Sequence, residues 1–240
     1  FYSLTIPTKI NYIIKVIIII IMVYLTILVS RKEMKMAKRG KIIENPITGE
    51  RMEFIQTSED TEGGLLQLML TVKPKGYIGV PHVHPYQEER LVVKSGSLLL
   101  KLGDDVCLLT AGHEGVIARG IPHLWWNSGS DDLKTLVEFR PALQIENYFS
   151  SILALAQAGK LNQKGLPNLL QIAVMNRKYW YEIYLTRPSI AVQKAFYRSI
   201  AWIGRLLGYQ PDYPCASRTI TLERDVYEYD LVPVPVENCD

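Results

Sequence analysis

The stretch PHVHPYQEER, residues 81–90, holds two of the chain's four histidines one residue apart, followed by two adjacent glutamates. Residues two apart in a β-strand point to the same face of the sheet, so His82 and His84 are predicted to project side by side. Two neutral imidazoles that share a cation suit Fe, Ni, Cu or Zn, and a carboxylate widens the choice toward Mn. This spacing therefore predicts a metal site.

The parity of the following residues indicates which glutamate joins the histidines. Glu89 has the same parity as Leu91 and Val93, whereas Glu88 has the same parity as Arg90. If the two apolar residues face the interior of a sheet, Glu89 faces the interior as well. Glu89 is thus the predicted ligand.

A second stretch, GHEGVIARGIPHLWWN at residues 112–127, supplies a third histidine, His123, from another strand. Trp125 has the parity of His123 and is predicted to wall the same pocket, with Tyr86 in the pocket or at its rim. Spacing alone indicates that three of the four histidines and one carboxylate could converge.

The two stretches resemble the two sequence motifs of the cupin superfamily. In chain order, the positions that match are Gly76, His82, His84, Glu89 and Gly96 for the first motif and Gly112, Gly120, His123 and Asn127 for the second. Ala118 stands where the family pattern has proline, a position that stiffens a turn and binds no metal. The 15 residues between the motifs, 97–111, suit the compact bacterial form, and the resemblance covers roughly residues 42–141.

The resemblance implies a double-stranded β-helix, or jelly roll, that holds one divalent transition metal (Fe, Mn, Zn or Ni) through His82, His84, Glu89 and His123. Open coordination positions would take water, O₂ or a small oxygen-bearing substrate, as in a dioxygenase, or would serve isomerase or lyase chemistry. The alternative is a non-catalytic cupin module that binds or senses a small molecule.

The elements that must position these residues are mainly strands. Residues 42–141 alternate apolar and polar side chains in short runs separated by turn residues, which predicts an all-β sandwich or barrel. Residues 142–209 change to a helical period and predict about three helices, the second over 169–185 and the third capped by Ser189. Residues 210–240 are predicted to be an extended tail.

Residues 1–41 form a hydrophobic segment with a basic flank, and they support two interpretations. The apolar run at 16–29 belongs to a stretch long enough for a single transmembrane helix, and the basic flank would keep the barrel in the cytoplasm. Alternatively, the segment is translated upstream sequence, and a soluble cytoplasmic protein begins at Met34 or Met36.

Charge and cysteine content limit the partners. Residues 1–41 carry eight lysines and arginines against one acid, which leaves residues 42–240 with a formal charge of −4 and argues against a nucleic-acid partner. Cys107, Cys215 and Cys239 form no CxxC pair, which argues against a disulfide framework or a thiolate zinc site, and Cys107 is predicted to be a buried strand residue. We expect a small-molecule ligand, and the helices suit a lid, a homodimer surface or a membrane-surface element.

Overall fold

The computed structural model describes residue 15 and residues 17–22, 37–76, 80–162, 165–216 and 218–219. The chain divides into two units, Phe1–Lys35 and Met36–Asp240. In the first unit, residue 15 and residues 17–22 are helical. The segment interpreted as a transmembrane helix or upstream translation lies mostly outside the described residues. No helix within the described ranges has the length and hydropathy that a membrane crossing requires.

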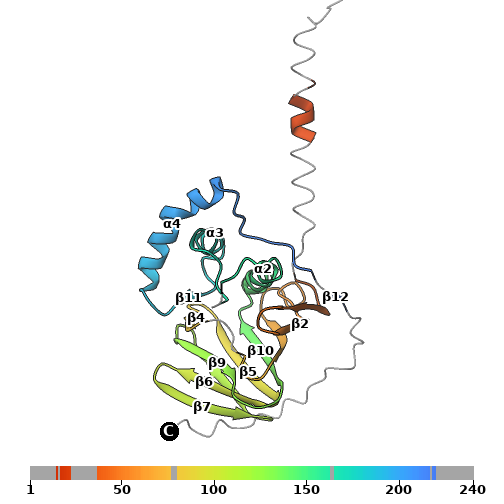
Figure 1. The fold of residues 1–240 in the computed structure, drawn as a ribbon, viewed down its shortest axis with the longest axis vertical. Coiled ribbons are helices and arrows are strands. Elements are labelled where there is room, and N and C mark those ends of the chain that lie inside the picture. The colour runs from red at the N-terminus through yellow and green to blue at the C-terminus, as the bar shows by residue number, and fades with distance from the viewer. Residues whose placement is uncertain are drawn as a thin grey trace, which may run out of the picture. The chain divides into compact units, whose positions relative to one another are not determined.

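The second unit is mainly β, as predicted, and its larger sheet has seven antiparallel strands (Figure 1). Their order in the sheet is β12-β1-β2-β3-β10-β5-β8. The strands are β1 (Lys41–Glu44), β2 (Arg51–Gln56), β3 (Leu66–Val72), β5 (Glu88–Ser95), β8 (Glu114–Ile117), β10 (Leu133–Arg140) and β12 (Arg218–Thr219). In the central strand β10, Val137 pairs with Leu68 on one side and Leu91 on the other, so three buried apolar residues lie in a row.

The smaller sheet has five strands in the order β11-β4-β9-β6-β7. The strands are β4 (His82–Val83), β6 (Ser97–Leu102), β7 (Asp105–Thr110), β9 (His123–Asn127) and β11 (Tyr184–Leu185). A hairpin joins β6 and β7, with Leu102 opposite Asp105. Cys107 on β7 is buried, as expected, but it is disulfide-bonded, so the inference against disulfides is wrong for this cysteine: sequence spacing does not reveal pairs that are brought together by the fold.

The two sheets enclose one apolar core. Leu68, Leu91 and Phe139 come from the larger sheet, and Leu98 and Trp125 come from the smaller one. Each of these side chains is at most 2% exposed. In β3 and β5 the two-residue period of a strand places every second side chain in this core, whereas β2 and β10 bury consecutive residues.

Three glycines of the two predicted motifs lie where the backbone turns. Gly96, between β5 and β6, has φ +86°, and a Cβ atom there would lie 2.9 Å from Leu133 Cα and 3.0 Å from Asp132 O. Gly112 and Gly120 also have positive φ, at +89° and +77°. Glycine adopts this backbone conformation without the steric cost that other residues meet.

Asn127 ties together the loops at one end of the barrel. Its side-chain Nδ2 donates to Val72 O and to Asp131 O, each at 2.8 Å, and its Oδ1 accepts from the Gly129 N–H at 2.9 Å. Its backbone N–H donates to Gly76 O at 3.0 Å. This buried amide therefore connects the loop after β3 to the turn after β9.

Three helices come after β10 in the described part of the second unit: α2 (Ile145–Gln157), α3 (Leu169–Lys178) and, after β11, α4 (Ile190–Leu206). Leu155 of α2 packs with Met175 of α3. Asn168 caps α3, because its side chain accepts from the Gln171 N–H at 3.0 Å. The helices thus form a second packed layer beside the barrel.

The prediction of one helix over residues 169–185 is wrong beyond Lys178. Tyr184 and Leu185 instead form β11, paired with Val83 and His82 of β4. No glycine or proline in residues 179–185 marks the end of the helix. Pairing with β4 and burial of Tyr184, which is 2% exposed, decide the local structure.

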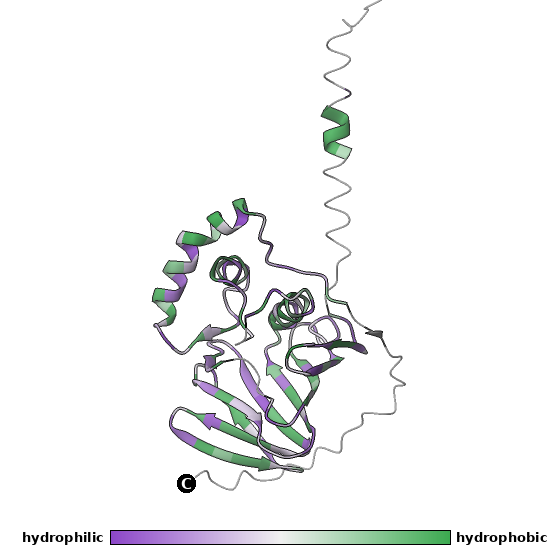
Figure 2. Ribbon diagram, in the orientation of Figure 1, coloured by the Kyte–Doolittle hydropathy of each residue, from purple (hydrophilic) through white to green (hydrophobic). Residues whose placement is uncertain are grey.

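Helix α4 carries both hydrophilic and hydrophobic residues along its outer surface (Figure 2). Ser189 occupies its N-cap position, as predicted, but its side chain makes no capping hydrogen bond. Tyr197 and Ala201 are buried against the rest of the unit, whereas Trp202 and Leu206 are 60% and 77% exposed. The helix therefore buries only part of its apolar surface against the described residues.

Residues 210–216, at the start of the predicted tail, have no regular secondary structure and pack on the helices. The Tyr213 hydroxyl donates to Gln171 Oε1 at 2.7 Å, and Gln157 Nε2 donates to Ala216 O at 2.9 Å. Of the remaining tail, only residues 218–219 are described, as β12.

Candidate metal centre

Four side chains converge between the two sheets. His82 lies in β4, His84 directly follows it, Glu89 lies in β5, and His123 begins β9, directly opposite His82 in the strand register. One potential ligand atom of each side chain lies within 4.8 Å of the others, and all four side chains are buried. Two ligands about 2.1 Å from one ion are at most about 4.2 Å apart, so small side-chain movements would bring these atoms around one ion.

A backbone carbonyl fixes the orientation of each imidazole. His82 Nδ1 lies 2.8 Å from Val80 O, His84 Nδ1 lies 2.9 Å from Glu182 O, and the His123 Nδ1 lies 2.9 Å from the carbonyl of residue 121. A carbonyl oxygen only accepts hydrogen bonds, so each Nδ1 carries the hydrogen and donates it. Each Nε2 is therefore the nitrogen left to face the centre of the cluster.

The imidazole Nε2 atoms and the Glu89 carboxylate that face each other in the cluster need a positively charged group between them. His123 Nε2 lies 2.9 Å and His84 Nε2 lies 3.6 Å from Glu89 Oε2. Lone pairs of nitrogen and carboxylate oxygen repel each other at such distances unless a proton or a cation lies between them. In addition, His84 Nε2 is buried and has no hydrogen-bond partner. The residues therefore fit a metal ion.

The protonation states of the cluster also suit a cation. Burial, together with the neighbouring histidines, lowers the pKa of His82 to about 3, and burial lowers the pKa of His84 to about 4. Burial opposes ionisation of Glu89, but the hydrogen bond from His123 and the nearby imidazoles outweigh it and lower the pKa of Glu89 to about 2. Burial likewise lowers the pKa of His123, but Glu89 outweighs it and raises that pKa above its ordinary value. Neutral His82 and His84 and an ionised Glu89 are the forms that bind metal, and a bound cation would replace the proton that His123 shares with Glu89.

Trp125 contacts the cluster, whereas Tyr86 does not. The Trp125 indole Nε1 donates to Glu89 Oε1 at 3.2 Å, and its ring lines the adjoining cavity. Tyr86, expected in the pocket or at its rim, is 42% exposed and packs against Tyr181, with ring centroids 5.3 Å apart. It does not line the cavity, because the turn after His84 directs its side chain outward.

The contribution of Glu182 to the site could not be found from the sequence. Its backbone carbonyl orients His84 across 98 residues of chain, although its own side chain is not part of the cluster. Every residue has a backbone carbonyl, so the type of side chain at this position does not indicate that its carbonyl contacts His84. The helical extension therefore contributes a carbonyl that orients one residue of the cluster.

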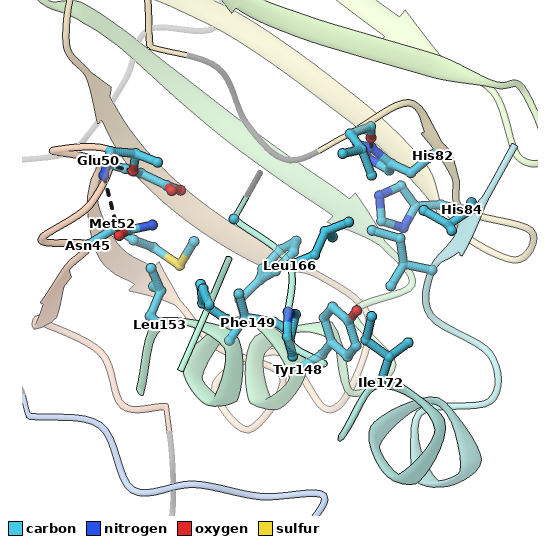
Figure 3. Close-up of a pocket in the computed structure, with 18 of the residues that line it drawn as sticks. Asn45, Glu50, Met52, His82, His84, Tyr148, Phe149, Leu153, Leu166 and Ile172 are labelled. Carbon is cyan, nitrogen blue, oxygen red and sulfur yellow. Dashed lines mark hydrogen bonds between the residues drawn. The ribbon is translucent and has the colours of Figure 1, made fainter. Parts of the chain in front are cut away.

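A cavity of about 170 Å³ opens beside the cluster. His82 and His84 lie at one end and Glu50 at the other, with Phe149 and Leu153 of α2 along one wall (Figure 3). Most of the lining is apolar, including Leu68, Phe139, Leu166 and Ile172. The cluster thus faces a space that a small molecule can enter.

The fold and site define an antiparallel β protein with a buried His₃Glu cluster between two sheets. Residues 68–139 match the family model described as "Cupin domain". The chain therefore contains a cupin domain, which carries all four residues of the cluster. The search of curated proteins finds no match.

The solved structures that match the chain have different described activities. A predicted oxalate decarboxylase from Thermotoga maritima is 19% identical, with 38% of this chain and 80% of that chain covered and a TM-score of 0.37. A sugar phosphate isomerase from Silicibacter pomeroyi is 17% identical (38% and 59% covered, TM-score 0.35). The cupin domain of a transcriptional regulator from Enterobacter cloacae is 20% identical (38% and 95% covered, TM-score 0.34). Likeness at this level does not carry an activity from one protein to another.

Proposed function

We propose that the chain is a metal-dependent enzyme that acts on a small oxygen-bearing molecule in the cavity beside the metal centre. In this proposal His82, His84, Glu89 and His123 hold one divalent transition metal. One observation carries the proposal: three imidazoles, each oriented by a carbonyl, direct Nε2 toward a shared carboxylate that opens onto a cavity.

The set of ligands is compatible with Fe, Mn, Zn or Ni. Three imidazole nitrogens and one carboxylate oxygen form a mixed site of intermediate hardness, which does not select one of these metals. A bound metal would supply a Lewis acid or, in the case of iron, a redox centre for O₂ chemistry. Either reaction type, dioxygenase-like or isomerase- and lyase-like, is consistent with the cluster.

The residues around the cluster would hold the ligands and exclude water. The carbonyls of Val80 and Glu182 keep two of the imidazoles in the orientation that presents Nε2. Trp125, which is 1% exposed, donates to Glu89 and covers one side of the carboxylate. Phe139 packs against the His84 ring, with centroids 5.2 Å apart. A dry and fixed set of ligands needs little rearrangement when metal or substrate binds.

Metal content tests the proposal directly. Elemental mass spectrometry on the anaerobically purified chain is expected to find about one transition metal per chain, because the four donors form one mononuclear site. The double variant His82→Ala/His84→Ala is expected to lose this metal. His113→Ala is the matched control, since His113 is exposed and lies outside the cluster.

Each outcome has a consequence for the proposal. Stoichiometric iron would direct substrate searches to O₂-dependent reactions, and Mn, Zn or Ni would direct them to isomerase and lyase assays. Metal that persists in the double variant would show that these histidines are not the ligands. Absence of metal from the wild-type chain, even after incubation with each of the four ions, would reject the proposal.

A second candidate function is a non-catalytic module that binds or senses a small molecule. The mainly apolar lining of the cavity favours it, because catalysis needs groups that move protons or stabilise charge. Of the cavity-lining residues, Glu50 and Glu89 are the carboxylic acids, and Glu50 lies at the end away from the histidines. Mass spectrometry of a ligand incubated with the metal-loaded chain distinguishes the two functions, since a binding module returns the ligand unchanged.

A further inference from the structure

The cavity beside the metal centre is built from segments of both the barrel and the helical layer. The barrel contributes Leu68 and Val137, α2 contributes Tyr148 and Leu153, and α3 contributes Ile172. Apolar walls of this kind bind the apolar body of a ligand by removing its surface from water. An engineered apolar cavity of about 150 Å³ holds benzene, so the 170 Å³ found in this chain suits a body of about one six-membered ring.

Away from the histidine cluster, the cavity wall contains a polar atom that has no hydrogen-bond partner among the described residues. Asn176 of α3 is 5% exposed and lines the cavity, as does Tyr197 of α4. Its carbonyl oxygen Oδ1 is buried and has no hydrogen-bond partner. A buried acceptor without a donor costs about 1–3 kcal/mol. A ligand with a hydroxyl or N–H group at this position would remove that cost.

A second polar group lies at the end of the cavity opposite the histidines. Glu50 lies at this end (Figure 3) and is 8% exposed, and its backbone carbonyl accepts from the Asn45 N–H at 2.8 Å. Burial raises the pKa of Glu50 to about 7, so near neutral pH much of this carboxyl group is uncharged. The far end of the cavity thus accommodates a neutral group better than an anion.

We propose that the cavity binds a molecule with an apolar body of about one ring, an oxygen group directed at the histidine cluster, and a hydroxyl or N–H group that donates to Asn176. The proposal rests on the proposed function for the metal-directed end of the ligand. The cluster by itself would hold any small oxygen ligand, so it does not define a substrate class. The shape and polarity of the cavity define that class. Highly polar molecules such as short dicarboxylates and sugars are excluded by the apolar walls.

Binding of three carboxylates to the Co(II)-loaded full chain tests this substrate class. The probes are propanoate, 3-phenylpropanoate and 3-(4-hydroxyphenyl)propanoate. Calorimetry and the visible spectrum of Co(II) measure the affinity of the chain for each probe. The phenyl group is expected to tighten binding at least about tenfold by burial of apolar surface. The hydroxyl group is expected to add about threefold to tenfold through one hydrogen bond.

Two variants identify the residues responsible. Leu153→Trp fills the cavity and is expected to remove the advantage of the phenyl group, whereas Leu108→Trp is the matched control on β7, where Leu108 is 56% exposed. Asn176→Leu is expected to remove only the advantage of the hydroxyl group, and it serves as the test if Leu153→Trp does not fold. Equal affinities for the three probes, or unchanged preferences in both cavity variants, would overturn the proposal.

The experiment separates this inference from the metal centre. If Co(II) binds and the probes show no preference, the substrate class is wrong and the metal centre stands. If Co(II) does not bind, the proposed function fails, and phenol binding to the metal-free chain tests the cavity alone. Phenol binding that is lost in Asn176→Leu would then support the apolar site, and absence of phenol binding would reject it.

Discussion

At the level of single residues, the site depends on the groups that hold the ligands as much as on the ligands. Three backbone carbonyls set the tautomers of the imidazoles, and the Trp125 indole occupies one oxygen of Glu89. The other oxygen of Glu89 is thereby directed at His84 and His123. Such supporting contacts orient metal ligands and contribute to affinity.

Removing the indole donor should therefore weaken metal binding. Trp125→Phe keeps an aromatic ring but leaves Glu89 Oε1 without its donor, and we expect metal affinity to fall about tenfold to a hundredfold. Competition with a chelator of known affinity measures the change. Trp126→Phe is the control, since Trp126 has the opposite parity on β9 and is only partly buried. Equal metal affinities of the two variants would contradict a role for the indole N–H.

The sequence predicted the side chains of the cluster better than their surroundings. The two-residue period of a strand places Glu89 inward, and the structure has Glu89 buried, with Glu88 and Arg90 only partly buried. The position of Tyr86 could not be derived from the same rule, because it lies in a turn rather than a strand. The carbonyl of Glu182 was beyond prediction, since it depends on the backbone path of a distant segment.

At the level of elements, the alternation of apolar and polar residues predicted the strands of the barrel. Sequence periodicity failed where contacts with a distant strand determine the local structure. Strands β9 and β10 lie within residues 42–141, where short strands were predicted. Residues 179–185 continue the helical spacing of apolar residues, yet Tyr184 and Leu185 pair with β4. Local propensity is a weak guide where a short segment gains sheet hydrogen bonds and burial.

The connection between β5 and β6 should tolerate no side chain at Gly96. Gly96→Ala combines backbone strain at φ +86° with a Cβ contact of 2.9 Å to Leu133 Cα, which flexible side chains cannot relieve. We expect the free energy of unfolding to fall by more than the roughly 1–2 kcal/mol of left-handed backbone strain alone. Gly103→Ala isolates that strain, because Gly103 has φ +60° and open space around it. Denaturant unfolding measures both variants, and equal losses would show that the contact with Leu133 is absent.

At the level of the whole molecule, the cavity could not be predicted from any one stretch of sequence. Its lining joins residues 45–52 of the barrel edge, the histidine cluster, and segments of α2, α3 and α4. The cavity exists only when these distant segments pack together, whereas periodicity describes neighbours along the chain. The sequence indicated a helical extension after the barrel, but only the structure shows the volume that the two enclose.

The buried ionisable groups give the folded unit two opposed dependences on pH. The folded-state pKa values of His82 and His84, about 3 and 4, lie below the ordinary 6.5. The stability that their neutral forms contribute to the folded unit is therefore full above pH 6.5 and is lost as the pH falls toward these values. Burial raises the pKa of Glu50 and of Glu182 from 4.5 to about 7, so their contribution is full below pH 4.5 and is lost as the pH rises through 7. Between pH 4.5 and 6.5 the two effects partly cancel.

Replacing Glu50 by glutamine should expose one of these dependences. The amide of Glu50→Gln does not ionise, so the variant avoids the cost of deprotonating a buried carboxyl group. We expect its free energy of unfolding, relative to wild type, to rise by up to about 3 kcal/mol between pH 4.5 and 7.5, at about 1.4 kcal/mol per pKa unit. Denaturant unfolding of the chelator-treated chain at several pH values measures the difference, with the exposed Glu62→Gln as the control. A difference that stays constant with pH in Glu50→Gln would mean that this carboxyl group is hydrated, and the far end of the cavity would then accept an anion.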